Sequence, residues 1–330
     1  MIISKTPLRI SFAGGGTDLS SFYEKGFGAV LNCAINKYIY VIIKERFDDL
    51  IILNWTKRES VNRPEDIEHE LVREALKRTG IKKGVEIITL AEIPSEGSGL
   101  GSSSSLIVGL LNAFYEFKGI QASHERLAVE ACKIEIDILG KPIGKQDHYA
   151  AAFGGLNEII FNKNGSVKVN RINISDENLR ILDACLLLFF TGMTRKAEAI
   201  LKKQKEKTDF IFETLMKMRS QTSFLKDCFE NRGIDSLGEI MNCGWAMKKS
   251  LLSEISNKDI DEMYGKALKA GASGGKICGA GGGGFLLLCV SIENQNAVKD
   301  ALKEYREFPF MLERYGSRII FNHRSDYWSK

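Results

Sequence analysis

The sequence predicts an α+β protein of two domains. Three observations carry this prediction: a length of 330 residues, strand-like and helix-like segments that alternate in the first half, and a second half in which long helices lie between two apolar strands. The composition, 44% hydrophobic and 27% charged, is sufficient for a large core. We place the boundary near residue 170, which gives domains of residues 1–170 and 171–330.

The first half is expected to form a mixed sheet covered by helices. Strands are predicted at residues 2–12, 29–35, 38–44, 51–54 and 85–90, where branched residues are frequent. Helices are predicted at residues 64–79, 102–117 and 123–139. In the last of these helices the buried stripe consists of Leu127, Ala131, Ile134 and Ile138, and Gly140 with Pro142 ends the helix.

The second half begins after a strand at residues 156–161 and a polar turn at residues 162–165. A strand is expected at residues 184–190, long helices follow it, and a further strand is expected at residues 285–290. The run from Phe285 to Val290 is apolar without interruption, which is typical of a buried strand.

The charge and the cysteines exclude several classes of function. Lys and Arg total 46 against 42 acidic residues, and a formal charge of +4 is too small to indicate a nucleic-acid or membrane partner, so a small-molecule partner is expected. Seven cysteines without a C-x-x-C pair and four histidines without metal spacing indicate buried thiols and no zinc site. Because no signal-type or membrane-length apolar run is present, we expect a cytoplasmic location; no pattern predicts an oligomeric state.

A glycine-rich run from Pro94 to Ser105 directly precedes the apolar helix predicted at residues 102–117. The N–H groups of a first helical turn lack internal partners and lie at the positive end of the helix dipole, so such a loop can hold phosphate. The sequence is not a P-loop, because Ser102 follows Gly101 where Lys is required, and the same serine replaces the third glycine of a dinucleotide fingerprint. The alternative is a capped helix after a flexible turn.

Two sets of carboxylates could act beside such a loop. Asp18 follows the glycines 14–16 at the end of the first strand, where an ionised carboxylate can accept hydrogen bonds from a polyol; the alternative is that it caps the next helix. Glu135 in a helix and Asp147 after it could serve as metal ligand and base, whereas Glu135 alone is more often a solvated helix position.

A third cluster of glycines precedes the apolar strand at residues 285–290. Its residues 279–284 include four consecutive glycines, which suit a place where the backbone of another segment approaches closely. A free linker is disfavoured, because linkers seldom continue directly into a buried strand.

These three segments, in this order, resemble the motifs of the GHMP kinase superfamily. The similarity covers nearly the whole chain: residues 7–18 resemble the first motif, residues 94–105 the second and residues 279–283 the third. The resemblance implies an N-terminal domain like domain 2 of ribosomal protein S5, with a left-handed βαβ unit, and a ferredoxin-like C-terminal domain. It also implies that ATP and Mg²⁺ bind between the two domains.

The resemblance also implies roles for individual residues. Glu135 would bind Mg²⁺ together with Ser103, for which Ser102 and Ser104 are alternatives. Asp147 would accept the proton of the attacking hydroxyl, or only orient it, and Arg9 would steady both Asp147 and the transferred phosphoryl group. The ATP-binding residues would be Pro94, Gly97, Ser98, Gly99, Leu100, Gly101, Ser102, Ser103 and Ser104, and the third motif loop Gly279, Ala280, Gly281, Gly282 and Gly283.

Departures from the galactokinase pattern bear on the substrate. Glycines stand where galactokinases carry two galactose-contacting side chains, and residues 12–19, 144–155 and 190–195 look most like D-glycero-D-manno-heptose 7-phosphate kinases. Those enzymes phosphorylate the anomeric hydroxyl, and the 1,7-bisphosphate feeds nucleotide-activated heptose for surface glycans. Another sugar, as in fucose-type kinases, and a non-catalytic regulator of the same fold remain as alternatives.

The expected substrate-binding residues are Gly15, Gly16, Thr17, Asp18, Lys145, Asp147 and Arg195. A sugar phosphate needs a cationic pocket distinct from the ATP loop, and Lys145, Arg195 and Lys196 are the candidates for it. The alternative is that these long basic side chains face water, because residues 195–207 form a charge-dense helix.

Overall fold

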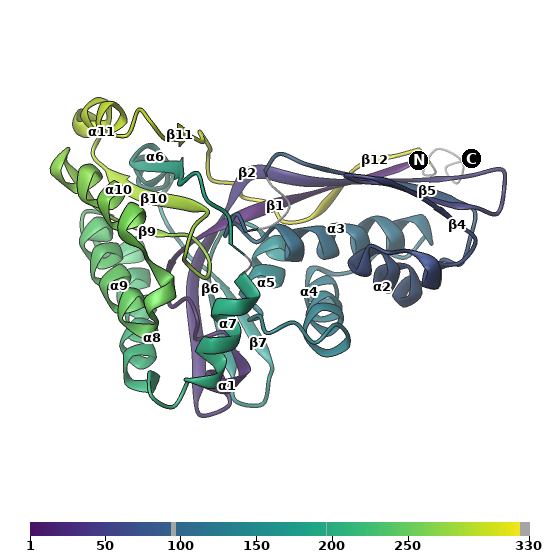
Figure 1. Ribbon diagram of the computed structural model, residues 1–330, viewed down its shortest axis with the longest axis horizontal. Coiled ribbons are helices and arrows are strands. Elements are labelled where there is room, and N and C mark those ends of the chain that lie inside the picture. The colour runs from purple at the N-terminus through teal and green to yellow at the C-terminus, as the bar shows by residue number, and fades with distance from the viewer. Residues whose placement is uncertain (94–96, 196, 324–330) are drawn as a thin grey trace.

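The N-terminal sheet is organised by one long strand, β2 (Phe27–Glu45), in a computed structural model that describes residues 1–93, 97–195 and 197–323 (Figure 1). Strand β2 pairs with β1 (Ile2–Ala13) along most of its length. Its first half also pairs with β6 (Leu156–Asn162) and its second half with β5 (Val85–Ala91). Strand β2 therefore connects the part of the sheet that contains β6 with the part that contains β5.

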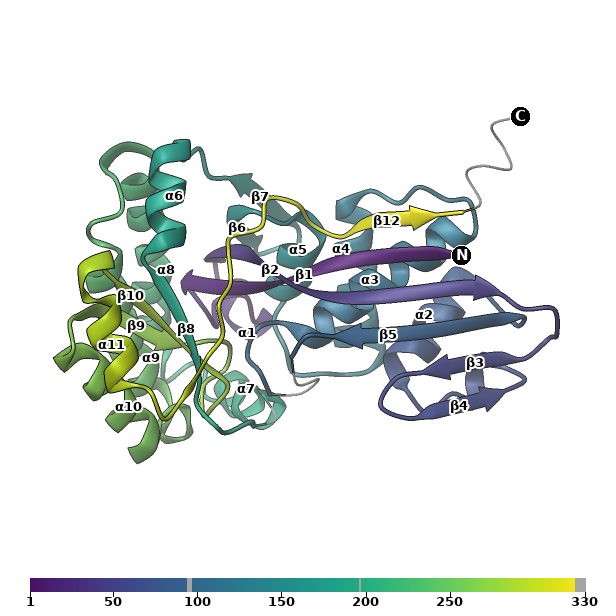
Figure 2. The same cartoon turned by 90° about the horizontal axis from the view of Figure 1, so that it is seen from above.

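Figure 2 shows the order of the strands across this sheet, β12-β1-β2-β5-β3-β4. Strand β3 (Ile51–Asn54) pairs in parallel with β5, and the other pairings are antiparallel, so the predicted mixed sheet is confirmed. The remaining strands are β4 (Arg58–Val61), β7 (Val167–Arg171), which pairs with β6, and β12 (Arg318–Asn322), which pairs with β1.

The prediction of two strands at residues 29–35 and 38–44 was wrong, because they are one strand with a bulge. Tyr38 lies opposite Pro7, whereas Ile35 lies opposite Leu8, so two residues of β2 have no counterpart on β1. The bulged residues are Asn36 and Lys37, and the N–H of Asn36 donates to the carbonyl of Met311, 2.8 Å away. The segment around Met311, from the C-terminal half, thus binds the backbone of β2 at the bulge.

Helices cover one face of this sheet (Figure 1). They are α2 (Glu70–Thr79), α3 (Ser102–Phe117), α4 (His124–Cys132) and α5 (Gln146–Phe153), with the short α1 (Ser20–Tyr23) beside the first glycines. The prediction for residues 102–117 is confirmed to the residue. The predicted helix at residues 64–79 is instead a 3₁₀ turn, Pro64–Asp66, followed by α2, because Pro64 fits a first turn and Ile67 is extended.

The predicted helix at residues 123–139 changes its winding, and this corrects its buried stripe. After α4 the chain makes a π-helical turn, Lys133–Ile138, which is wider than an α-helical turn and so rotates the following side chains. Leu127, Ala131 and Ile134 are buried as predicted, but Ile138 is 51% exposed. Glu135 is buried instead, so it is not a solvated helix position.

The C-terminal half contains a second, four-stranded sheet of order β11-β8-β10-β9. Its strands are β8 (Leu186–Phe190), β9 (Ala272–Ile277), β10 (Phe285–Val290) and β11 (Arg306–Glu307). The helices of this half are α6 (Asp176–Ala184), α7 (Ala197–Glu206), α8 (Phe212–Asp227), α9 (Leu237–Leu251), α10 (Lys258–Lys269) and α11 (Gln295–Ala301). A π-helical turn, Cys228–Arg232, follows α8, and 3₁₀ turns lie at Ser253–Ile255 and Ile292–Asn294.

Side chains of β8 and β10 alternate between two cores, which explains their uninterrupted apolar sequences. Leu286 and Leu288 pack into the helical core of the C-terminal half. Phe285 and Leu287 pack toward β1, where Leu8 and Ile10 belong to the same core. The two halves therefore share one apolar core, and such a large apolar interface resists free movement of one half against the other.

The division at residue 170 stays a prediction. The last strand, β12, belongs to the C-terminal part of the chain but pairs with β1 in the N-terminal sheet, and Figure 2 shows it beside β1. None of the helices in the described part of the chain is long and apolar enough to cross a membrane.

Leu287→Ala tests the shared core. Leu287 is fully buried, so removing its side chain leaves a cavity and should lower the free energy of unfolding by about 2–5 kcal/mol. Urea denaturation followed by tryptophan fluorescence measures this change. Leu90→Ala, at a half-exposed position of β5, is the matched control and should change stability by about 0.5 kcal/mol or less. Equal effects of the two substitutions would contradict the shared core.

Candidate active site

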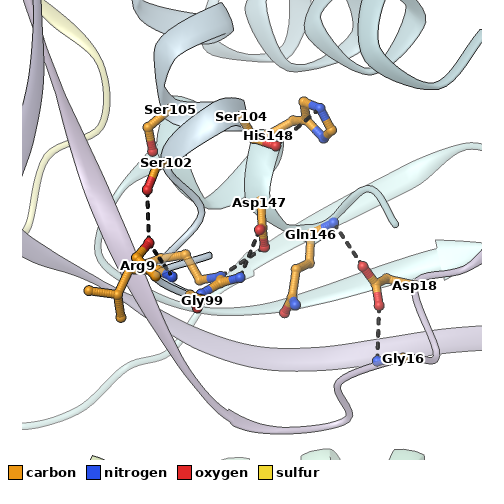
Figure 3. Close-up of polar contacts among 12 residues, drawn as sticks. Arg9, Gly16, Asp18, Gly99, Ser102, Ser104, Ser105, Gln146, Asp147 and His148 are labelled. Atoms are coloured by element: carbon orange, nitrogen blue, oxygen red, sulfur yellow. Dashed lines mark hydrogen bonds and ion pairs between the residues drawn. The ribbon is translucent and has the colours of Figure 1, made fainter. Parts of the chain in front are cut away.

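Arg9 and Asp147 form a two-pronged ion pair at the centre of the site (Figure 3). Arg9 Nε lies 2.8 Å from Asp147 Oδ1 and Nη2 lies 2.7 Å from Oδ2. Burial alone would lower the pKa of Arg9, but the charge of Asp147 and its hydrogen bonds raise it. The guanidinium is 3% exposed and the Asp147 side chain 24%, so the carboxylate is the member of the pair that a substrate can reach.

The same arginine also holds the predicted phosphate loop. Its Nη1 donates to the carbonyl of Gly99 at 2.5 Å, and its backbone N–H donates to the carbonyl of Leu100 at 3.0 Å. A Cβ atom added to Gly101 would lie 3.3 Å from Asp147 Oδ2, so the loop passes directly beside the carboxylate. Sequence reasoning placed these residues in one site, and the structure brings them together.

Asp18 connects the first glycines to the helix that carries Asp147. Its Oδ1 accepts from the N–H of Gly16 at 3.1 Å, and its Oδ2 accepts from the N–H of Gln146, the first residue of α5, at 3.3 Å (Figure 3). It does not cap the helix that follows it in the sequence. Burial, with the nearby charge of Asp147, raises the pKa of Asp18. Asp18 thus satisfies an unpaired N–H at the start of α5.

The serines before and within α3 are not equivalent. Ser102 shares a hydrogen bond of 2.9 Å with Ser98, Ser104 donates to Glu135 at 2.9 Å, and Ser105 donates to the carbonyl of Pro7 at 2.8 Å. Ser103 is half-buried, and its hydroxyl makes no hydrogen bond within the described residues. Of the four hydroxyls, that of Ser103 is therefore the one free for a ligand. Gly97, Gly99 and Gly101 adopt φ of 73°, 74° and 81°, which favours glycine.

The third glycine cluster packs against this loop. A Cβ atom added to Gly279 would lie 2.7 Å from the Cα of Gly99, and one added to Gly284 would lie 2.4 Å from the carbonyl oxygen of Ser98. The close approach expected from four consecutive glycines is present, and the segment that approaches is the predicted phosphate loop. Gly281, Gly282 and Gly283 face residues 193–195 and 254–255 of the C-terminal half, and Ala280 belongs to its core.

Glu135 is held in the interior by its neighbours on α3 and α5. Its Oε2 lies 2.8 Å from His148 Nε2 and accepts from Ser104 Oγ. Burial alone would raise the pKa of Glu135, but these hydrogen bonds and the charge of Lys141 lower it, so the group is ionised. The π-helical turn is what points this carboxylate inward, and such turns are frequent at functional sites.

The residues present fit a divalent cation. Glu135 Oε1 is fully buried and makes no hydrogen bond within the described part of the chain, and Lys141 Nζ lies 4.0 Å from it. An ionised carboxylate oxygen and the free hydroxyl of Ser103 are hard oxygen donors of the kind that Mg²⁺ prefers. A Mg²⁺ ion bound there would neutralise phosphate charge next to the loop.

The residues predicted to bind the phosphate group of the sugar substrate do not lie in one place. Lys145 Nζ donates to the carbonyl of Gly165 at 2.7 Å and lies over the ring of Tyr23, so its ammonium group is already bound within the N-terminal half. Arg195 is exposed and lies against Gly97 and Gly282, next to the phosphate loop and not to Asp18. Lys196 and Pro94 lie outside the described residues. A substrate role for Lys145 or Arg195 stays a prediction.

Sequence reasoning missed three polar side chains on the C-terminal side of the site. Lys248 on α9, Lys276 on β9 and Gln204 on α7 are all buried. Lys276 could have been suspected from its place just before the third glycine cluster. Nothing local distinguishes Lys248 or Gln204 from other polar helix residues, because only the tertiary fold brings them beside the first glycines.

Comparison with known proteins agrees with this geometry. Residues 68–155 match the GHMP kinases N terminal domain, and residues 225–307 match the GHMP kinases C terminal domain. The chain is 32% identical to a D-glycero-alpha-D-manno-heptose 7-phosphate kinase from Campylobacter jejuni, over 94% of this chain and 97% of that protein. The chain belongs to the GHMP kinase family.

Two other relatives extend the comparison. A solved structure of a D-glycero-D-manno-heptose 1-phosphate kinase from Bacteroides thetaiotaomicron is 27% identical and superimposes with a TM-score of 0.83, over 98% of this chain and 100% of that chain. A bifunctional fucokinase/GDP-fucose pyrophosphorylase from Arabidopsis thaliana is 25% identical over 92% of this chain and 31% of that protein. The predicted two-domain GHMP kinase fold and the enzyme class, a phosphotransferase with an alcohol group as acceptor, are confirmed.

Glu135→Gln tests the predicted metal site of this GHMP kinase. The amide keeps the size of the side chain but removes the charge, so Mn²⁺ should bind about 10- to 100-fold more weakly in the presence of a non-hydrolysable ATP analogue. Electron paramagnetic resonance of free Mn²⁺ measures this affinity without turnover. Glu125→Gln, at an exposed position of α4, is the control. Unchanged Mn²⁺ affinity in Glu135→Gln would remove Glu135 from the metal site.

Proposed function

We propose that this GHMP kinase transfers the γ-phosphoryl group of ATP to the anomeric hydroxyl of D-glycero-D-manno-heptose 7-phosphate. The product would be the 1,7-bisphosphate, a precursor of nucleotide-activated heptose for surface glycans. The observation that carries the proposal is the Arg9–Asp147 pair, held beside a phosphate loop in a chain similar along its length to a heptose 7-phosphate kinase. Seven free cysteines, six of them buried, are consistent with a reducing cytoplasm.

The loop and helix α3 supply the ATP side of the proposed site. No side chain of the described residues caps the N-terminus of α3, so its first N–H groups are available to phosphate oxygens. Phosphoryl transfer needs mainly positioning and charge neutralisation, so a rigid set of donors contributes more than covalent chemistry. The contact with the third glycine cluster supplies this rigidity.

Asp147 is the group that would accept the proton of the attacking hydroxyl. It is the partly exposed member of the ion pair, and its hydrogen bonds to Arg9 fix the direction of both carboxylate oxygens. The transition state of phosphoryl transfer is loose, so Asp147 can orient the hydroxyl first and take its proton late. Arg9 would stabilise the charge that moves from the hydroxyl oxygen toward the phosphoryl group.

A single assay distinguishes this proposal from two alternative functions. The similarity to a fucokinase favours fucose as the second candidate substrate. A non-catalytic regulator is disfavoured, because the residues to which this proposal gives catalytic roles, Arg9, Asp147 and Glu135, are all present. An ADP-release assay on heptose 7-phosphate, heptose, fucose and galactose should give the highest kcat/KM for heptose 7-phosphate, with phosphorus NMR locating the new phosphate at C1. A higher value for fucose would replace the proposal, and no turnover on any sugar would indicate a regulator.

Asp147→Asn tests the role of the carboxylate. The amide cannot accept the proton and loses the ion pair, so kcat should fall about 10²- to 10⁴-fold, while the affinity for ATP stays within a few-fold of the wild type. Steady-state kinetics and calorimetry with an ATP analogue measure the two effects. Asp137→Asn, at an exposed position of the π-helical turn, is the control. Near-normal turnover in Asp147→Asn would exclude its assigned role.

A further inference from the structure

Two buried lysines of the C-terminal half face the first glycine loop and the catalytic pair. Lys248 on α9 is 5% exposed and lies within the electrostatic influence of Asp18. Lys276 lies on β9, which packs against α9, and it is 9% exposed and lies within the electrostatic influence of Lys248 and Arg9. Two buried ammonium groups therefore lie near the loop of residues 14–18 and near Arg9.

Lys248 is connected to that loop by Gln204. Its Nζ donates to Gln204 Oε1 at 3.3 Å. A Cβ atom added to Gly16 would lie 2.2 Å from Gln204 Nε2, so the amide rests on the backbone of the loop. Gln204 is fully buried, and its Nε2 has no hydrogen-bond acceptor within the described residues. The loop, the amide and the ammonium group thus form one continuous set.

The ammonium groups of this set have no directly bonded anionic partner among the described residues. No ion pair joins Lys248 or Lys276 to a carboxylate of the described chain, and Lys276 makes no side-chain hydrogen bond there. The two carboxylates nearby are already bound, Asp147 to Arg9 and Asp18 to two backbone N–H groups. Burial lowers the pKa of both lysines to about 8, as expected for ammonium groups that lack an anionic partner.

The unused donors match a phosphate group. Nε2 of Gln204 is a fully buried donor without an acceptor, and Lys248 and Lys276 have N–H groups that donate to no acceptor in the described part of the chain. Phosphate oxygens accept several charge-assisted hydrogen bonds at once. A buried ammonium group is unfavourable unless it is paired, so an anion bound here would be strongly retained.

We propose that Lys248, Gln204 and Lys276 form the subsite for the phosphate group that the sugar substrate carries. This inference rests on the proposed function, because it assigns a phosphorylated sugar to the same active site. The contacts of Gln204 and Lys248 run to the glycine loop at Gly16 and not to the phosphate loop at residues 97–101, so these two side chains serve the acceptor and not ATP. An unphosphorylated sugar leaves the buried donors without partners and is rejected for that reason.

Lys248→Met tests the subsite, because it keeps the length of the side chain and removes the charge. The protein is saturated with Mg²⁺ and a non-hydrolysable ATP analogue, which occupies the phosphate loop, and inorganic phosphate or heptose 7-phosphate is then titrated by calorimetry. Loss of a charge-assisted hydrogen bond should weaken both about 10- to 100-fold and leave the binding of unphosphorylated heptose unchanged. Lys249→Met is the matched control, since the neighbouring Lys249 pairs with Asp261 at 2.9 Å on the surface.

Gln204→Leu is the second variant and should weaken phosphate binding in the same way; urea midpoints establish that each variant is folded. The subsite is overturned if phosphate binds equally to the wild type and Lys248→Met, if it does not bind to the wild type, or if the variant loses affinity for the ATP analogue instead. If phosphate binding depends on Lys248 but the wild type turns over no heptose 7-phosphate, the subsite stands and the proposed function fails.

Discussion

The contact between Arg9 and Asp147 is the constraint on which the rest of the site depends. One buried guanidinium fixes the direction of the carboxylate, holds a carbonyl of the phosphate loop and lies on a strand of the central sheet. A buried ion pair is more stable when its remaining donors are also satisfied, and here the carbonyl of Gly99 accepts a third hydrogen bond from the guanidinium. A single side chain thus contacts the loop, helix α5 and the sheet.

Much of the fold could be predicted from local sequence, since α3, β3 and β10 have the predicted bounds. Predictions from local sequence patterns were wrong where tertiary contacts changed the spacing of the buried residues along a strand or helix. The bulge in β2 is stabilised by a contact with Met311, and the π-helical turn exchanges Ile138 for Glu135 at the buried face. The second failure is informative, because Glu135, the predicted metal ligand, is buried between α3 and α5, whereas Ile138 is exposed.

Some residues of the candidate site could be predicted from local sequence and others could not. Its N-terminal members form glycine-rich or charged motifs that are contiguous in sequence, and those could be found. Lys248 and Gln204 could not be found, because each is one polar residue on an amphipathic helix and acquires meaning only when α7 and α9 pack beside the first glycines. The side chains proposed to bind the acceptor phosphate thus lie in the C-terminal half, which has few sequence motifs. The residues proposed for phosphoryl transfer lie in the N-terminal half, which has several.

The close approach of Gly99 and Gly279 has a consequence for how the protein is built. The N-terminal half contains Arg9, Glu135 and Asp147. The third glycine cluster, which packs against the phosphate loop of this half, belongs to the C-terminal half. A methyl group at either glycine would separate the two backbones. The N-terminal half expressed alone would therefore contain the three residues without the segment that packs against the loop, so we expect activity to require both halves of the chain.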